Sequence, residues 1–216
     1  MGTVTRMPAR GRYVAWEAGQ LAGVSGLTLG QWARRGYIRA SMDAGTPHVY
    51  SFRDVAEAMV VHEMLERGVS HREIRHAIDR LDEYGDWPLT DAPIATLPEK
   101  GAARIVVTTE EGTYDVGDRG WQQVVEPESL EIIRGQLHRG GWAVRLLPEL
   151  QHIEVHPGRL SGRPSIRGRR IAAQDVAELA AAPDGVDALT DGYDLTLDEI
   201  ADARRWWEEV RRLEAA

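Results

Sequence analysis

Residues 13–36, YVAWEAGQLAGVSGLTLGQWARRG, decide the fold of the first part of this 216-residue chain. Apolar residues recur at helical spacing over 13–22, which predicts a short amphipathic helix. A tight turn at 23–25 follows, and its serine is placed to cap a second helix over 26–35. Gly36 suits the left-handed conformation that ends such a helix. Two short helices joined by three or four residues that include a glycine are typical of a helix-turn-helix.

The residues that follow predict a wing and two further helices. Residues 37–50 indicate a short hairpin around a loop that contains glycine and proline. Two helices, to about residue 67 and to about residue 83, then begin at serine–acid pairs with capping-box spacing. These pairs are Ser51 with Asp54 and Ser70 with Glu73.

The rest of the chain predicts a connector and a helical end. Prolines among polar residues indicate a linker over 84–102, and 104–116 indicates a hairpin. A strand near 121–125, a helix over 127–137 and a strand over 142–147 complete this module. Helices are expected over 172–182 and 186–191, and after Thr196, which has capping-box spacing to Glu199. We therefore expect an α+β fold, mainly α, with a winged helix-turn-helix over about 10–84, a linker and small β-rich connector over 85–151, and a three-helix domain over 152–213.

Composition excludes several classes of protein. No run of about 18 apolar residues is present, so we expect no membrane span. The first residues have no apolar core of the kind that a secretory signal needs. The chain has no cysteine, which excludes disulfides and thiolate chemistry and fits a reducing compartment. We expect a cytoplasmic protein that needs no cofactor.

Charge is divided along the chain, whose net charge is −8. Residues 1–40 hold six arginines against the single acid Glu17, and residues 159–170 hold five arginines and no acid. Nine carboxylates lie between Asp175 and Asp202 with no basic residue among them. The two basic segments are therefore candidates for binding separate polyanionic partners.

The second helix of the motif is the candidate for DNA contact. Its exposed positions are predicted to carry Thr28, Gln31, Arg34 and Arg35, while Trp32 packs inward. Glutamine pairs with adenine edges and arginine with guanine edges in the major groove. Arginines outside the helix are candidates for phosphate contacts, namely Arg10, Arg12 and Arg39. The alternative is a small helical subdomain whose arginines are only solvated.

The region 13–81 resembles the MerR family of winged-helix regulators. The resemblance lies in V-S-x-x-T-L-x-x-W-x-R-R-G-Y-I at 24–38, followed by Y-S-F-R-D-V, E-R-G-V-S and I-R-x-A-I-x-R-L. It implies a winged-helix head that binds operator DNA. Gly30 and His48 stand where this family often has arginine. Gly26 and Gly30 each weaken a helix by about 1 kcal/mol relative to alanine.

A second resemblance covers about 152–210. I-E-V-H-P-x-x-x-x-G-R-P-S-I-R-G-R-R-I at 153–171, then D-V-A-E-L and D-L-T-L-D-E-I-A-D-A, is similar to a domain long described as of unknown function. In bacteria this domain is associated with VapB-type antitoxins, whose partners are PIN-like ribonucleases. The resemblance implies an antitoxin that blocks such a toxin and regulates its own operon.

Arginines of the second basic segment are the candidates for toxin contact. A PIN nuclease holds metal with clustered carboxylates, with which an arginine can form bidentate pairs. Arg163 and Arg167 are favoured, together with Arg159. Alternatively this segment is a structural loop, in which Arg169 and Arg170 belong to the fold.

Two other features are weaker candidates for sites. His152, Glu154 and His156 would share one face of a strand and suggest a metal-dependent enzyme, but no fourth ligand is evident. We expect no metal site and no enzyme. Trp206 and Trp207 on the last helix cannot both face the core, which suggests a homodimer interface. The remaining alternative is a plain transcription factor whose C-terminal domain dimerises or senses a ligand.

Overall fold

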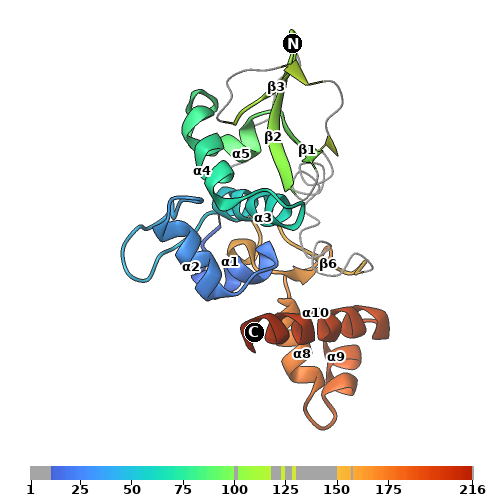
Figure 1. Cartoon of the computed structure of the whole chain (residues 1–216). Coiled ribbons are helices and arrows are strands. Elements are labelled where there is room, and N and C mark those ends of the chain that lie inside the picture. Colours follow the sequence, from blue (N-terminus) through green and yellow to red (C-terminus); the bar gives the residue numbers. More distant parts are fainter. Residues whose placement is uncertain are drawn as a thin grey trace.

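The computed structural model describes residues 11–99, 102–117, 123–124, 128–129, 150–156 and 158–215. The described chain is arranged in three tiers, with a sheet at one end, the first four helices in the middle and the last three helices at the other end (Figure 1). The predicted α+β fold is confirmed. None of the described helices is long and apolar enough to cross a membrane.

The helix-turn-helix forms as the sequence predicts. Ser25 caps the second helix, because its Oγ accepts a hydrogen bond from the Thr28 amide at 3.2 Å. Gly36 follows that helix with a φ of 73°. The four helices of this region, which we call the head, are α1 (Ala15–Ala22), α2 (Gly26–Arg34), α3 (Phe52–Glu66) and α4 (His71–Arg80).

The wing has less strand pairing than the hairpin that the sequence predicts. Asp43 and Val49 form an isolated antiparallel bridge, with their amides and carbonyls paired at 3.1 and 2.9 Å. Tyr50 leaves the hairpin and pairs instead with Tyr13, through two backbone hydrogen bonds of 3.0 and 2.8 Å. The returning segment of the wing is therefore held against the start of the helix-turn-helix.

The two predicted capping boxes differ in the structure. At the start of α3 both halves of the box form between Ser51 and Asp54. At the start of α4 the Ser70 hydroxyl accepts from the Glu73 amide, but the Glu73 carboxylate accepts from the amide of Ile105 at 3.1 Å. The second box is therefore half formed, and its acid ties the head to the sheet.

The linker predicted over 84–102 is wrong. The segment begins at the end of a 3-10 turn (Asp82–Tyr84). It then forms the short helix α5 (Pro88–Asp91) and the strand β1 (Ile94–Glu99). Pro88 occupies the first turn of α5, where a missing amide hydrogen costs little. Proline and polar residues are here compatible with regular structure because the neighbouring strand supplies the pairing.

The middle of the chain forms an antiparallel sheet in the order β4-β3-β2-β1-β5. The predicted hairpin is confirmed as β2 and β3, and Glu128–Ser129 is a strand where the sequence predicts a helix. The rest of that helix, most of the strand near 121–125 and the strand expected over 142–147 lie outside the described residues. The remaining bounds are β2 (Ala102–Thr109), β3 (Gly112–Asp115), β4 (Gln123–Val124) and β5 (Glu128–Ser129).

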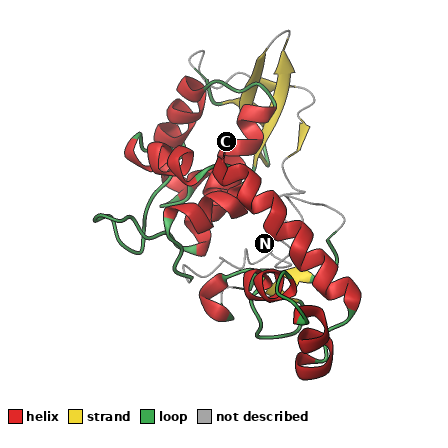
Figure 2. Cartoon of the chain, turned by 90° about the horizontal axis from the view of Figure 1, so that it is seen from below, coloured by secondary structure: helices red, strands yellow, loops and turns green. Residues whose placement is uncertain are grey.

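The sheet shares one hydrophobic core with the head. Ile105 and Val107 of β2 are fully buried in the same cluster as Val61 and Met64 of α3. Figure 2 shows the strands together on one side of the helices. The sheet therefore stabilises the head directly.

The C-terminal part, which we call the tail, has its own core and the three predicted helices. Thr196 and Glu199 form the predicted capping box through three hydrogen bonds of 2.8 to 3.2 Å. Trp206 and Val210 lie in the tail core. The tail elements are β6 (Ile153–Glu154), a 3-10 turn (Leu160–Gly162), β7 (Ser165–Ile166), α8 (Ala173–Ala180), α9 (Gly185–Tyr193) and α10 (Leu197–Ala215).

Head and tail meet at a tight seam. The buried Tyr13 hydroxyl donates to the Gly162 carbonyl at 2.9 Å, and the Arg12 amide donates to the Ser161 carbonyl at 3.2 Å. A Cβ on Gly162 would lie 1.7 Å from the Tyr13 hydroxyl oxygen. A glycine is therefore required where the tail loop passes over the tyrosine ring.

Candidate nucleic-acid interface

Helix α2 turns one polar face to solvent. Leu29 and Trp32 lie on its other side and are buried in the head core. The solvent-facing side chains follow each other at helical spacing, with Thr28 half-buried among exposed neighbours: Leu27, Gln31, Arg34 and Arg35. The structure thus brings the four predicted helix positions together on one face and adds Leu27 to them.

Close contact with α1 holds α2 in place. A Cβ on Gly26 would lie 2.8 Å from the Cα of Trp16, and a Cβ on Gly19 would lie 2.7 Å from the Val24 carbonyl oxygen. The expected helix-weakening effect of Gly26 is therefore only part of its role. This glycine lets two helices approach closely enough to form a compact motif.

The head arginines on this side are mostly not engaged by the protein. Arg34 and Arg35 on α2, and Arg12 before α1, are exposed, and in the described parts of the chain no ion pair involves them. Arg39 is different, because it forms an ion pair with Asp86 in which both side chains are more than half exposed. Arg10 lies outside the described residues. Three guanidinium groups are therefore available to an external anion.

The tail arginines show the opposite behaviour. Arg159 is paired with Glu154. Arg163 donates to the Gln174 side chain at 3.1 Å and lies 3.8 Å from the Glu17 carboxylate of α1. Two of the three predicted toxin contacts are thus engaged within the chain.

Arg169 belongs to the fold, as the alternative interpretation of this segment expects. Its guanidinium donates to the carbonyls of Tyr193 and Asp194 at 3.1 and 2.6 Å, and it pairs with Glu199 at 3.3 Å. Burial pushes the pKa of Glu199 upward, but hydrogen bonds from Thr196 and Arg169 hold it below its ordinary value. Arg169 therefore joins the α9–α10 connection to the basic loop.

Arg167 and Arg170 remain at the tail surface. Both are exposed, and the described residues provide no ion-pair partner for either of them. The second basic surface expected from the sequence is therefore reduced from five arginines to two.

The two histidines considered as metal ligands each interact with another group of the chain. His152 Nδ1 lies 2.8 Å from Asp202, Glu154 pairs with Arg159, and His156 accepts from the amide of Gly158. Burial raises the pKa of Asp202, yet hydrogen bonds from His152 hold it below the usual value. Within the described part of the chain, no three ligand-type side chains are grouped to hold a metal.

The two tryptophans of α10 have different environments. Trp206 is 2% exposed in the tail core and lines a crevice with Tyr13 and Trp16. Its indole therefore offers no surface to a second copy, contrary to the sequence prediction for this residue. Trp207 is half-buried and remains the candidate of the pair for a dimer contact.

Two regions of the chain match family models in the comparisons with known proteins. Residues 13–81 match the family described as MerR HTH family regulatory protein. The head is therefore similar to the helix-turn-helix of MerR-type regulators. Residues 153–206 match the family described as protein of unknown function DUF433. These matches correspond to the two resemblances noted in the sequence.

Two curated relatives and one solved structure are also similar to this chain. HTH-type transcriptional regulators Rv1830 of Mycobacterium tuberculosis and Mb1861 of Mycobacterium bovis, both described as uncharacterized, are 31% identical over 101 residues. That match spans 45% of this chain and 44% of each relative. The crystal structure of Rv2018 from Mycobacterium tuberculosis superposes with a TM-score of 0.56 at 20% identity, over 92% of this chain and 98% of that chain. This likeness shows the fold of both regions together.

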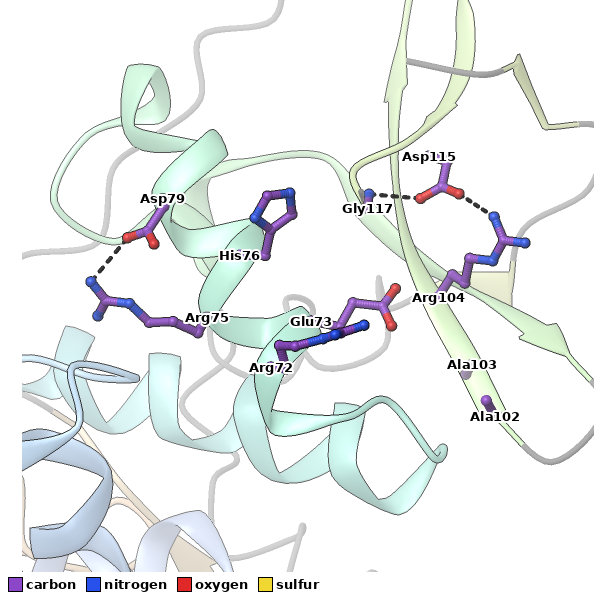
Figure 3. Close-up of a pocket in the computed structure, with 10 residues that line it drawn as sticks. All are labelled: Arg72, Glu73, Arg75, His76, Asp79, Ala102, Ala103, Arg104, Asp115 and Gly117. Carbon is purple, nitrogen blue, oxygen red and sulfur yellow. Dashed lines mark hydrogen bonds and ion pairs between the residues drawn. The ribbon is translucent and has the colours of Figure 1, made fainter. Parts of the chain in front are cut away.

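A cleft of about 550 Å³ lies between α4 of the head and strands β2 and β3 (Figure 3). Its charged side chains are largely paired with each other or with backbone. The pairs are Arg75 with Asp79, Arg104 with Asp115, and Glu73 with the Ile105 amide. Arg72 and His76 also interact with neighbours. The cleft therefore has little charge left to attract a charged effector. This favours a structural role for its charged residues.

Proposed function

We propose that this chain is a DNA-binding transcriptional regulator that binds operator DNA through the exposed face of α2. The observation that carries the proposal is the pair Arg34 and Arg35, which are exposed beside Gln31 without a carboxylate partner in the described structure. An arginine that the protein does not neutralise retains its full attraction for phosphate or for a guanine edge.

The charge of the whole molecule supports a specific mode of binding. The net charge of −8 opposes non-specific adhesion to DNA, whereas the local excess of arginine before residue 41 attracts it. Together these charges favour an approach to DNA through the head. The wing between Asp43 and Val49 follows α2 closely in the sequence. In this proposal it supplies a second contact, to the sugar–phosphate backbone of the DNA.

A binding experiment with a matched control tests the proposal. Duplexes are selected from a randomised pool with the full chain, and their affinity is measured by fluorescence anisotropy. Changing Arg34 and Arg35 to alanine is expected to weaken binding by about 100-fold, since each base or phosphate contact contributes about 1–3 kcal/mol. The control changes Arg204 and Arg205, an adjacent arginine pair on α10, and removes the same charge. Equal losses in both variants, or no selected duplex, would overturn the proposal.

We further propose that the regulator binds as a homodimer to two half-sites. A dimer places two α2 helices on one duplex, so binding sites from the selection should be palindromic. Mass photometry of the complex measures the stoichiometry. A single chain on an asymmetric site would contradict the dimer.

The finer proposal is that the tail makes this regulator an antitoxin of a PIN-like ribonuclease. Support comes from the resemblance of 153–171 to VapB-associated domains and from the exposed Arg167 and Arg170. Carboxylates that hold the nuclease metal are suitable bidentate partners for these two guanidinium groups. Arg159 and Arg163 are already engaged inside the chain and are secondary candidates.

Co-expression with the adjacent toxin gene tests the antitoxin proposal. The wild-type chain is expected to restore growth and to co-purify with the toxin, and alanine at both Arg167 and Arg170 is expected to abolish the rescue. The Arg204–Arg205 variant serves again as the control for lost charge. If the wild-type chain neither binds nor neutralises the toxin, the antitoxin role is wrong while DNA binding stands.

A further inference from the structure

Leu27 is the most exposed large hydrophobic residue in the described structure. Its relative exposure is 70%, compared with 66% for Leu197, 52% for Tyr193 and 36% for Trp16. Leu27 also lies on the one face of α2 that the proposed function assigns to DNA. An apolar side chain at such a position gains nothing from phosphate, so its role must come from another group in the groove.

Leu27 is in the first turn of α2, next to the Ser25 cap. In helix-turn-helix proteins the N-terminal residues of the second helix approach the base edges most closely. The neighbouring Thr28 hydroxyl lies 2.9 Å from the Ser25 hydroxyl and is engaged at the cap. Leu27 is therefore the first-turn side chain that is free to contact a base.

The chemistry of the major groove indicates which base this is. Guanine, cytosine and adenine present hydrogen-bonding groups there, and thymine alone adds an apolar group, its C5-methyl. Leucine has no donor or acceptor, so it cannot discriminate the polar edges by pairing. Contact with a methyl group removes apolar surface of both partners from water and is favourable.

The surroundings of Leu27 favour DNA over a protein as the occupant of this face. The segment 26–36 contains Arg34 and Arg35 and no acidic residue. An apolar group on the same helix face as two cations that have no described ion pair matches a polyanion with methyl groups in its groove. A protein partner on this face would need its own carboxylates opposite both arginines.

We propose that Leu27 is a specificity-determining residue that contacts the C5-methyl of a thymine in each half-site. The proposal rests on the proposed DNA-binding function and deepens it. With Gln31 suited to adenine and Arg34 to guanine, it predicts a half-site in which a thymine lies next to the bases that these two side chains contact.

A double-mutant cycle between protein and DNA tests the contact. In a duplex selected with the full chain, each thymine is replaced in turn by uracil, which removes only the C5-methyl. Replacing the contacted thymine is expected to weaken wild-type binding by about 4-fold for each half-site that is changed, in line with the value of one buried methyl group. The Leu27→Ala variant should bind the thymine duplex more weakly than the wild type does, by a similar factor. Replacing the contacted thymine by uracil should not change the affinity of this variant.

Leu197→Ala is the matched control, because Leu197 is an equally exposed leucine at the start of another helix. It should bind both duplexes like the wild type. Thermal midpoints of both variants should equal that of the wild type, since neither side chain is in a core.

The outcomes separate the two proposals. Wild-type binding that tolerates every uracil, or a Leu27→Ala variant that still responds to one, would overturn the thymine contact and leave DNA binding intact. Failure to select any duplex would overturn both.

Discussion

The head and the tail each carry a basic segment, and the structure treats the two in opposite ways. On α2, Arg34 and Arg35 are exposed and form no described ion pair. In the tail loop, Arg159, Arg163 and Arg169 are held by carboxylates, by an amide and by carbonyls. The difference lies in what packs around each segment rather than in its composition. A cluster of arginines indicates a binding surface only where the fold supplies no acceptors of its own.

The two segments should therefore respond differently to mutation. Changes to the engaged residues of the tail loop should lower the free energy of unfolding, and changes to the exposed arginines of α2 should lower DNA affinity without affecting stability. Single substitutions test this separation, starting with the largest expected effect.

Gly162→Ala should destabilise the protein most. The new Cβ would overlap the Tyr13 hydroxyl, and the backbone there has a φ of 91°, which disfavours alanine. We expect a loss of about 3 kcal/mol, from overpacking and from the left-handed conformation together. Urea unfolding of the full chain measures it.

Gly168→Ala is the matched control for the seam. Gly168 has a similar φ of 75°, but no atom lies within 4 Å of the position that a Cβ would take there. It should cost only the conformational part, about 1 kcal/mol. Equal losses in the two variants would show that the contact between head and tail contributes nothing.

Arg169→Ala should have the next largest effect. It removes the donors to the Tyr193 and Asp194 carbonyls and leaves the Glu199 carboxylate without its cation. We expect a loss of about 2 kcal/mol, typical of hydrogen bonds from a charged group. Arg170→Ala, at an exposed neighbouring position, should change stability by less than about 0.5 kcal/mol. A larger effect at Arg170 would contradict the division between structural and surface arginines.

The sequence predicts the head well and the tail surface poorly, for physical reasons. Ser25, Gly36 and the capping pair of Ser51 act over a few residues, so their spacing is enough to place helix ends. The partners of Arg163 and Arg169 lie on other elements, and no local pattern indicates which carboxylate will reach them. The β1 strand escapes sequence prediction for the same reason, since its pairing with β2 outweighs its proline content.

One signal for the base contact of Leu27 is present in the sequence. Leu27 follows the cap of a helix whose core positions, Leu29 and Trp32, are already occupied by other apolar residues. An extra leucine off the apolar stripe indicates an exposed position. The buried Glu57 has no such signal, because the Leu89 amide that donates to it lies on a separate element, α5.

Glu57 extends the comparison within the head, because it is a buried carboxylate of α3 that has no cation paired with it in the described structure. Burial raises its pKa from 4.5 to about 8, against hydrogen bonds from the Leu89 and Thr90 amides that lower it. The folded protein thus binds a proton that the unfolded chain releases above pH 4.5. Stability from this group is complete below that pH and is lost as the pH rises through about 8, with a slope of up to about 1.4 kcal/mol per pH unit.

Glu57→Gln should remove this dependence. Its free energy of unfolding should match that of the wild type near pH 5 and exceed it near pH 8, as measured by urea unfolding at both values. Glu66→Gln, at an exposed position of the same helix, should keep the wild-type slope. Parallel curves for Glu57→Gln and the wild type would show that the carboxylate is not protonated in the fold.

Arg39 is intermediate between the paired arginines of the tail and the exposed arginines of α2, and its ion pair gives the smallest expected effect on stability. It is paired with Asp86 like a tail arginine, yet both side chains are exposed like those of α2, at 57% and 62%. Asp86→Ala breaks this pair. Because exposed ion pairs contribute little to stability, the substitution should change the free energy of unfolding by less than about 0.5 kcal/mol. If Arg39 is then released to a phosphate, DNA affinity should rise by about 2- to 5-fold at low salt, and the slope of log K against log salt should steepen by about 0.9 for each bound protomer. Asp79→Ala breaks the comparable Arg75 pair on α4 and should leave both quantities unchanged. An Asp86→Ala variant with the wild-type salt slope would show that the released Arg39 makes no additional phosphate contact.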